Sequence, residues 1–231
     1  MVLPAPHVPA PLQLRIATSS GRVTVTADDR VDVVVDRGEV GPTIDGVVEI
    51  RPQRGSSSVE VRCPEGADLV VGTGSGSVEL HGRLGSVSVT SASGSIRVSE
   101  VTDADLRTTS GSVEIADCDD RCRVSTKSGK VTVEETGTAD ISTVSGTIRI
   151  ERVTGAVQAR TVSGGVSIVS DAQGPVTAQT VSGGVRVKLP AGVRPAVRVS
   201  GPHETECGCD QGDDLTVEVR TISGTVEITP V

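Results

Sequence analysis

The residues of this chain that could bind a metal ion gather in one segment, GPHETECGCDQGDD at residues 201–214. Its possible ligands are His203, Glu204, Glu206, Cys207, Cys209 and Asp210. Imidazole and thiolate groups suit zinc and other borderline metals. The spacing His-x3-Cys-x-Cys, however, is not one of the standard zinc patterns. Two interpretations therefore stay open: a metal- or redox-responsive loop at 203–210 with His203, Cys207 and Cys209 as ligands, and an ordinary polar insertion.

Two other cysteines, Cys118 and Cys122, lie close together in the segment DCDDRC, which the pattern places at a turn. They could pair with each other or contribute thiols to a site. The chain has five cysteines in all, and an odd number does not make a closed disulfide framework. We therefore expect reduced thiols, and no cofactor is predicted.

No set of residues for catalysis is recognisable in the sequence. The three histidines, His7, His81 and His203, have no convincing serine or cysteine partner for a hydrolase triad. The glycine run GTGSG at 72–76 is not followed by Lys-Ser or Lys-Thr, as a phosphate-binding loop would be, and it is interpreted as a turn. The sequence thus predicts a non-enzymatic protein with no evident small-molecule substrate.

Charge and composition exclude further classes. The formal net charge is −8 and the chain has no Phe, Tyr or Trp. A negative protein without aromatic rings neither neutralises phosphates nor stacks bases, so nucleic acid is not an expected partner. No apolar run approaches the roughly 18 residues of a membrane-spanning helix. The start of the chain, MVLPAPHVPAPLQL, has neither a basic segment nor a continuous apolar stretch, so no signal peptide is predicted and a cytoplasmic location is expected.

A repeat of about 18 residues organises most of the chain. Segments such as TTSGSVEI, TVSGTIRI and TVSGGVRV each place a Ser-Gly corner before a short strand. Successive corner glycines are 17 to 19 residues apart, at positions 76, 94, 111, 129, 146, 164 and 183. Two further corners are predicted at Gly201, in RVSG, and at Gly224, in TISG. A second alternating strand, such as GAVQARTVS at 155–163, lies between corners. Neither strand alone buries a hydrophobic face, so the repeat predicts an all-β fold, a β-solenoid with two short strands in each coil and two parallel sheets around a shared aliphatic core.

The alternation also predicts which side chains point inward. On the strand before each corner, Val157, Ala159 and Thr161 should be buried with Ser163, while Val162 should be exposed. Stacked coils would then bury a ladder of hydroxyls that satisfy one another, formed by the serine before each corner glycine and by Thr73, Thr108, Thr126, Thr143, Thr161, Thr180 and Thr221. The same facing exposes an aliphatic stripe along the C-terminal half, made of Val144, Val162, Val181, Val199 and Ile222. An exposed apolar row indicates contact with a partner or a second copy, and surface valines retained for β-propensity are the other interpretation.

The regularity of the repeat divides the chain. Residues 1–11 form a Pro-rich flexible lead, and 12–71 are predicted to be irregular N-terminal β coils or a cap, with a separate β domain as the alternative. Residues 72–231 form the regular solenoid, in which 202–214 is predicted to be an inserted loop.

The corners of the form T-x-S-G-x-V-x-V, preceded by VRCPEGADLVVGTGSG at 61–76, resemble the bacterial putative-adhesin family. The resemblance covers residues 12–231, and the closing segment VEVRTISGTVEITPV fits the family's usual ending. It implies a β-solenoid domain of largely unassigned function, and it offers no catalytic motif. We therefore expect a non-enzymatic structural scaffold or protein-binding module that self-associates through a sheet face or a coil end, with the metal- or redox-responsive loop as the alternative.

Overall fold

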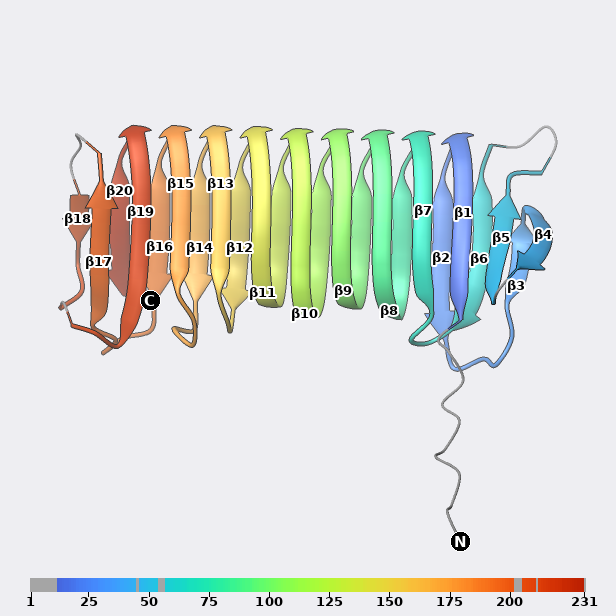
Figure 1. Ribbon diagram of the computed structural model, residues 1–231, viewed down its shortest axis with the longest axis horizontal. Helices are drawn as coiled ribbons and strands as arrows, with labels where there is room; N and C mark the ends of the chain where they lie inside the picture. The colour runs from blue at the N-terminus through green and yellow to red at the C-terminus, as the bar shows by residue number, and fades with distance from the viewer. Residues whose placement is uncertain (1–11, 45, 54–56, 202–204, 211, 231) are drawn as a thin grey trace, which may run out of the picture.

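The computed structural model describes residues 12–44, 46–53, 57–201, 205–210 and 212–230, and strands stacked along one long axis dominate this part (Figure 1). The strands are β1 (Gln13–Ser20), β2 (Val23–Asp28), β3 (Val34–Arg37), β4 (Glu39–Ile44), β5 (Val47–Arg51), β6 (Val59–Pro64), β7 (Asp68–Ser75), β8 (Val78–Ser93), β9 (Ile96–Ser110), β10 (Val113–Ser128), β11 (Val131–Ser145), β12 (Ile148–Val153), β13 (Val157–Ser163), β14 (Val166–Ser170), β15 (Val176–Ser182), β16 (Val185–Leu189), β17 (Pro195–Ser200), β18 (Thr205–Cys207), β19 (Leu215–Ser223) and β20 (Val226–Pro230). The described residues include no helix long and apolar enough to cross a membrane.

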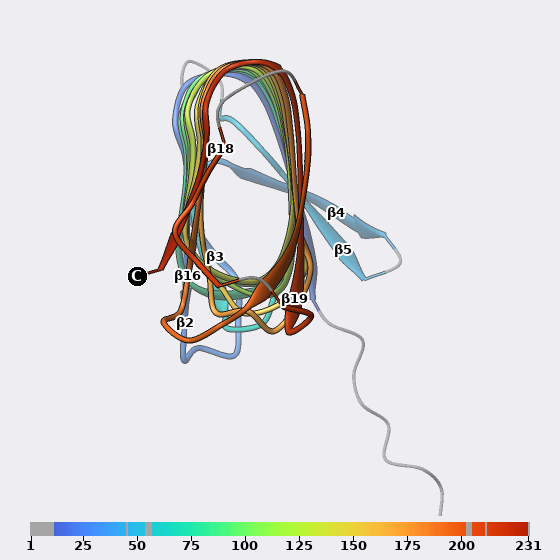
Figure 2. The same cartoon turned by 90° about the vertical axis from the view of Figure 1, so that its left-hand side faces the viewer.

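The strands form two parallel faces, which confirms the predicted β-solenoid. On the first face the order is β5–β1–β7–β8–β9–β10–β11–β13–β15–β19–β17. On the second face it is β6–β2–β8–β9–β10–β11–β12–β14–β16–β20–β18. Strands β8 to β11 take part in both faces, because each of them bends around the lower edge of the solenoid. Viewed along the long axis, the coils superpose and form a flattened loop (Figure 2).

The core between the faces consists of aliphatic columns that repeat from coil to coil. On the second face one column is fully buried, with 0 to 2% exposure, and comprises Val78, Ile96, Val113, Val131, Ile148, Val166, Val185 and Val226. On the first face Val157 and Ala159 are buried while Arg160 and Val162 are exposed. β-Branched side chains suit this arrangement because their restricted rotamers pack well on a pleated surface. The predicted facing of these strands is confirmed.

The Ser-Gly corners stack directly on one another along the upper edge. The amide of Gly164 donates a hydrogen bond to the carbonyl oxygen of Ser182, 3.0 Å away in the next coil. Gly164 has a φ of +144°, and a Cβ placed on it would overlap the backbone carbonyl of Gly146 in the preceding coil. Only glycine combines this backbone angle with such a close approach. Each such corner glycine therefore packs directly on the backbone of the corner in the neighbouring coil. This contact requires a glycine once in each period of about 18 residues.

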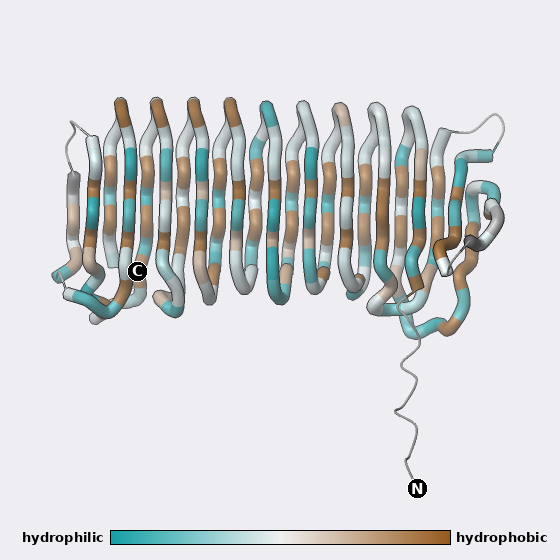
Figure 3. The backbone as a smooth tube through the Cα atoms, in the orientation of Figure 1, coloured by the Kyte–Doolittle hydropathy of each residue, from teal (hydrophilic) through white to brown (hydrophobic). Residues whose placement is uncertain are grey.

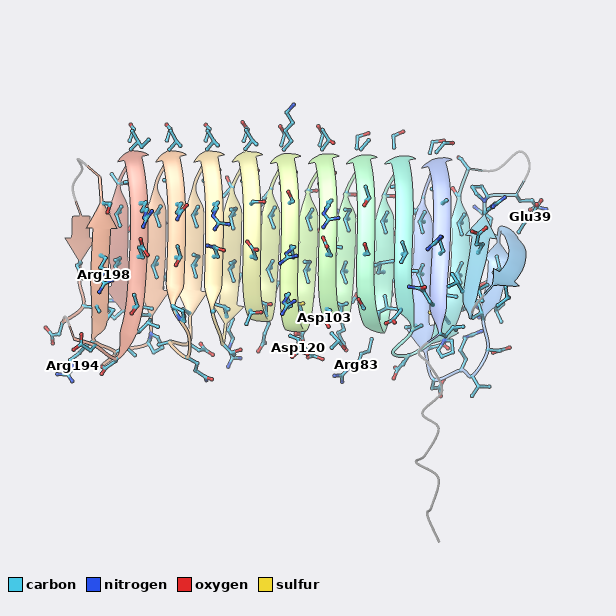
Figure 4. All side chains as sticks on the ribbon, viewed as in Figure 1. Glu39, Arg83, Asp103, Asp120, Arg194 and Arg198 are labelled. Carbon is cyan, nitrogen blue, oxygen red and sulfur yellow. The ribbon has the colours of Figure 1, made fainter. Side chains whose placement is uncertain are left out.

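Charged side chains on the outer faces pair between neighbouring coils. Arg97 lies between two glutamates, with its Nε 2.9 Å from Oε2 of Glu114 and its Nη1 4.0 Å from Oε1 of Glu79. At the basal edge, where Figure 4 labels Arg83, that side chain reaches past one coil and pairs with Asp119 of β10 at 2.7 Å. Such exposed pairs contribute about 0.2–1 kcal/mol each, so they support the coil register while the aliphatic columns supply most of the stability.

Both ends of the solenoid exchange the order of their coils. At one end β1 and β2 are the first strands of the chain, yet β5 and β6 lie outside them. At the other end β17 and β18 lie outside the later strands β19 and β20. Antiparallel pairing of β3 with β6 and of β4 with β5 covers the N-terminal end, and the β4–β5 hairpin projects from the stack in Figure 2. Unpaired sheet edges promote association, so this hairpin protects one end of the stack.

The C-terminal coil departs from the prediction in two ways. Part of the predicted loop at 202–214 is a strand, because β18 pairs with β20. Gly201 is not a corner glycine of the regular column, since a Cβ on it would meet the backbone of Thr221, whereas Gly224 continues the column above Gly183. The local RVSG pattern matches the repeat, but the exchanged order places this segment in a different register.

Candidate functional site

Four aliphatic side chains form an exposed row on the upper edge of the solenoid, which we call the apolar ridge. Its members lie in neighbouring coils held in register by the flanking threonine and serine pairs, and they are Val144, Val162, Val181 and Ile222. Their exposed fractions are 47%, 48%, 42% and 66%. Figure 3 shows the ridge as brown segments at the upper ends of four adjacent coils. The predicted exposure is present, and the row lies on the narrow edge rather than on a flat sheet face.

Val199 does not belong to the ridge, which corrects the predicted stripe. It lies opposite Val219, a fully buried residue of β19, and it is only partly exposed against the core. The cause is the exchanged coil order, because β17 meets β19 in a register that places Ser200 beside Arg220. The stripe is therefore shorter than the sequence pattern indicates.

The ridge ends where the same position becomes polar or small. Lys127 is the next residue of the row, since its neighbours Thr126 and Ser128 pair with Thr143 and Ser145. Beyond it the row continues with Thr109, Ala92, Gly74 and Ser19. A lysine at this position is compatible with the fold, and the apolar surface is confined to four C-terminal coils.

The two shoulders of the ridge differ in shape. On the first face a groove of about 610 Å³ runs beside it, lined in part by the long side chains of Arg160, Gln179 and Arg220. Both arginines are well exposed, at 46% and 61%, although Arg160 lies 3.8 Å from Asp140 and Arg220 lies 2.8 Å from Glu218. On the other shoulder two of the four coils continue as Gly-Gly, at 164–165 and 183–184, and two as Gly-Thr, at 146–147 and 224–225. A smaller groove of about 250 Å³ runs there, lined in part by Arg186 and Glu227. A partner would therefore meet a groove with polar side chains on each side of the ridge.

A row of buried threonines lies next to the ridge, as predicted. The members Thr143, Thr161, Thr180 and Thr221 are each 5% exposed, and their hydroxyls have no hydrogen-bond partner among the described residues. Farther along the row the hydroxyls of Thr18, Ser91, Thr108 and Thr126 instead donate to the carbonyl oxygen two residues later in their own strand. The predicted mutual ladder of hydroxyls is wrong, because some of these hydroxyls bond to a backbone carbonyl of their own strand and the others have no partner among the described residues.

The serines of the corners are also placed differently from the prediction. Ser145, Ser163, Ser182 and Ser223 are exposed, whereas the sequence pattern placed them inside with the threonines. The strand ends at each serine and the chain turns there into the glycine corner, so the alternation of facing no longer applies. The exposed serines border the ridge on the side of the second face.

The difference between paired and unpaired threonines gives a stability prediction. Thr126→Val removes a 3.2 Å hydrogen bond to the carbonyl of Ser128 and is expected to lower the free energy of unfolding by about 1 kcal/mol. Thr180→Val removes a buried hydroxyl without a partner, so it should be neutral or slightly stabilising. Urea denaturation followed by circular dichroism measures both, and a larger loss for Thr180→Val would show that its hydroxyl is hydrogen-bonded.

The cysteines of the predicted turn are core residues. Cys118 and Cys122 are fully buried and hydrogen-bond to each other, which lowers the pKa of Cys118 and raises that of Cys122. The Sγ of Cys118 also lies 3.8 Å from the carbonyl oxygen of Thr102. Both are free thiols, as expected, and they fill positions that hold Val101 and Ala104 in the adjacent coil.

Of the predicted metal ligands, His203 lies outside the described residues. Cys207 and Cys209 are partly exposed, and the Cys207 thiol donates to the carbonyl oxygen of Cys209 over 3.6 Å. Burial is the largest cause that raises the pKa of Cys209. Among the residues that the structure describes, no group of three or more His, Cys, Asp or Glu side chains could hold a metal ion. The metal site therefore stays a prediction.

The protein is a β-solenoid, because its coils stack through glycine corners around an aliphatic core. The chain belongs to the family described as Toastrack DUF4097, whose model matches residues 13–229. The resemblance inferred from the corner motif is confirmed by this match. No curated protein matches the chain.

Two solved structures are similar to the chain. One is a "putative adhesin" from Bacteroides fragilis, with 11% identity, a TM-score of 0.44 and coverage of 94% of this chain and 92% of that one. The other is a "putative cell adhesion protein" from Clostridium sporogenes, with 8% identity, a TM-score of 0.25 and coverage of 95% and 92%. At these scores neither similarity bears on function.

Proposed function

We propose that the chain is a non-enzymatic scaffold that binds protein through the apolar ridge. The observation that carries this proposal is the alignment of four aliphatic side chains, 42 to 66% exposed, on an edge whose other equivalent positions hold small residues, a threonine or a lysine. Rows of exposed apolar groups bordered by polar ones are typical of protein interaction sites. The repeated coils below them supply a rigid base.

The self-association expected from the sequence is one form of this binding. It was expected at a sheet face or a coil end, and the ridge lies on the edge between the two faces. The C-terminal coil end is a second possible surface, because β17 and β18 each pair with one described strand only. The ridge is favoured because its apolar side chains are more exposed than Val197 and Val199 of β17, which pack against the core.

The proposal is tested by replacing two ridge residues with lysine. The Val162→Lys/Val181→Lys variant is expected to keep its fold, since Lys127 occupies the same position naturally. It should lose at least about 10-fold in affinity for any protein bound at the ridge, because a lysine there would be desolvated on binding. The immobilised wild type and variant are compared for the proteins that they retain, the soluble chain itself included, by quantitative mass spectrometry.

The control is Thr90→Lys/Ser125→Lys, which adds the same two charges at exposed positions on the first face. Binding that survives in this control and fails in the ridge variant supports the proposal. If no retained protein distinguishes the ridge variant from the control, the ridge is not a binding site. The alternative metal- or redox-responsive role of the 203–210 loop stays a prediction, which elemental analysis of the purified protein can decide.

A further inference from the structure

We propose that Cys118 and Cys122 form a reversible thiol–disulfide switch, in which a low-molecular-weight disulfide oxidises the two thiols to an internal disulfide across the basal turn of β10. This inference goes beyond the proposed function, because it concerns the edge of the solenoid opposite the apolar ridge. It rests on the placement of the two side chains, on the shape of the turn between them and on the chemistry of the pair.

The two thiols lie inside the same narrow corner of the solenoid. Cys118 precedes the basal turn and Cys122 follows it, so they come from the two faces that the turn joins. Both are 0% exposed, and the Cys122 thiol donates a hydrogen bond to the Cys118 sulfur. The three residues between them, 119–121, are exposed and form the outside of the turn. A disulfide requires side chains that point toward each other, which this placement provides.

The turn of β10 is one residue longer than the turns beside it. Three residues separate the two cysteines, whereas two separate the residues in register with them in each adjacent coil, Val101 and Ala104 in β9 and Thr136 and Ala139 in β11. The next coil makes room for the longer turn with Gly137, where a Cβ would overlap the carbonyl oxygen of Asp119. The extra residue lets the turn adjust when the two sulfurs move from contact to a bond of about 2.05 Å.

The chemistry of the pair gives the two sulfurs different roles. The hydrogen bond from Cys122 lowers the pKa of Cys118, so Cys118 is the thiolate that attacks one sulfur of the small disulfide. This attack forms a mixed disulfide and releases one small thiolate. Cys122 then loses its proton and attacks the Cys118 sulfur, which releases the second small thiolate. The two protons of the pair pass to the two released thiolates, so one disulfide forms while another is reduced.

Access to the pair requires a local opening of the basal turn, because neither sulfur is exposed. Two exposed polar contacts hold the turn to its neighbours: Arg83 pairs with Asp119 at 2.7 Å, and the Thr138 hydroxyl donates to the carbonyl oxygen of Asp120 over 2.9 Å. Exposed contacts of this kind are weak, so the turn can open without unfolding of the coils. The carboxylates that Figure 4 labels at this edge, Asp103 and Asp120, disfavour an anionic reagent, so a neutral disulfide is the suitable probe.

The equilibrium of the pair tests the inference. The full-length chain carries Cys207→Ser and Cys209→Ser, so that Cys63 is the only other thiol. It is equilibrated with 2-mercaptoethanol and its disulfide, once folded and once in urea, starting from both the reduced and the oxidised form. Acid quenching, alkylation and peptide mass spectrometry then give the fraction of internal disulfide. Its equilibrium constant should be at least about 10-fold larger in the folded chain than in urea, because the fold holds the two sulfurs together.

Thermodynamic linkage supplies a second measurement. If the folded chain favours the disulfide by a given factor, the oxidised chain must have an unfolding constant that is lower by the same factor. Urea denaturation of the oxidised and reduced forms, followed by circular dichroism, measures this factor independently of the thiol chemistry.

Cys63 is the internal control, since it is equally buried in β6, four strand spacings from β10 or about 19 Å away. Burial raises its pKa to about 11, so it should stay reduced. Cys118→Val and Cys122→Ala introduce the residues that β9 has at these positions, so each should keep the fold and abolish the internal disulfide. An equilibrium constant no larger in the folded chain than in urea would overturn the inference. So would a folded chain in which both thiols, from either starting form, end as reduced as Cys63.

Discussion

Replacing Gly164 with alanine is expected to lower the free energy of unfolding by about 3 kcal/mol or more, the largest effect predicted for a single methyl group in this chain. Two causes act together. The φ of +144° is strained for any residue with a Cβ, and the added methyl group would overlap the carbonyl of Gly146 in the neighbouring coil. That carbonyl belongs to backbone, so it cannot move aside as a flexible side chain would. The corner must open, which breaks the hydrogen bonds to the adjacent coils.

The neighbouring glycine provides a matched control for this prediction. Gly165 lies one residue later in the same corner, and the nearest atom to a Cβ placed on it is the carbonyl oxygen of Gly184 at 3.8 Å. Gly165→Ala should therefore cause no loss and can stabilise by about 0.4–1 kcal/mol, because it restricts the unfolded chain. The protein has no aromatic residues, so urea denaturation is followed by circular dichroism. Equal losses for both variants would show that the corner does not depend on close backbone contact.

The structure of a single coil could be predicted from the sequence, because the same pattern of strands and corner recurs in every period of the repeat. Two short alternating strands and a glycine corner specify which residues enter the core, as Val157, Ala159 and Thr161 illustrate. The exposed lysine at position 127 agrees with this facing of the strand before the corner, since an unpaired charge in the core is costly. The ridge could be predicted from the same alternation, because Val162 and Val181 lie one residue beyond a buried threonine.

The exchanged ends could not be predicted in this way. The segment RVSG at 198–201 has the local pattern of a corner. Which strand lies beside it, however, depends on long-range strand pairing, and neither composition nor spacing indicates that pairing. Val199 was misplaced for this reason. The serines were misplaced for a different reason. The prediction applied the inward–outward alternation of strand side chains to Ser163, where the strand ends and the turn begins, and the alternation no longer holds there. The partner of the ridge has no signature in the sequence, since exposed valines serve equally for β-propensity and for binding.

Replacing Ile228 with alanine is expected to lower the free energy of unfolding by about 3 kcal/mol. Its side chain is fully buried in β20, between β16 and β18, and its removal leaves a cavity that close-packed β-branched neighbours cannot fill. The core contains no aromatic residue, so only aliphatic side chains surround the cavity. Urea denaturation measures the loss, as for the glycine variants.

Ile222→Ala makes the same chemical change in the same coil and serves as the control. Its side chain is 66% exposed on the apolar ridge, so at protein concentrations below self-association it should change stability by less than about 0.5 kcal/mol. It should weaken binding at the ridge, while Ile228→Ala does not act on binding directly. The pair thus separates the two roles that isoleucine has in this coil, inside the solenoid for folding and on its edge for contact. A large loss of monomer stability from Ile222→Ala would mean that the ridge is part of the core, and the ridge would then have to be abandoned as a binding site.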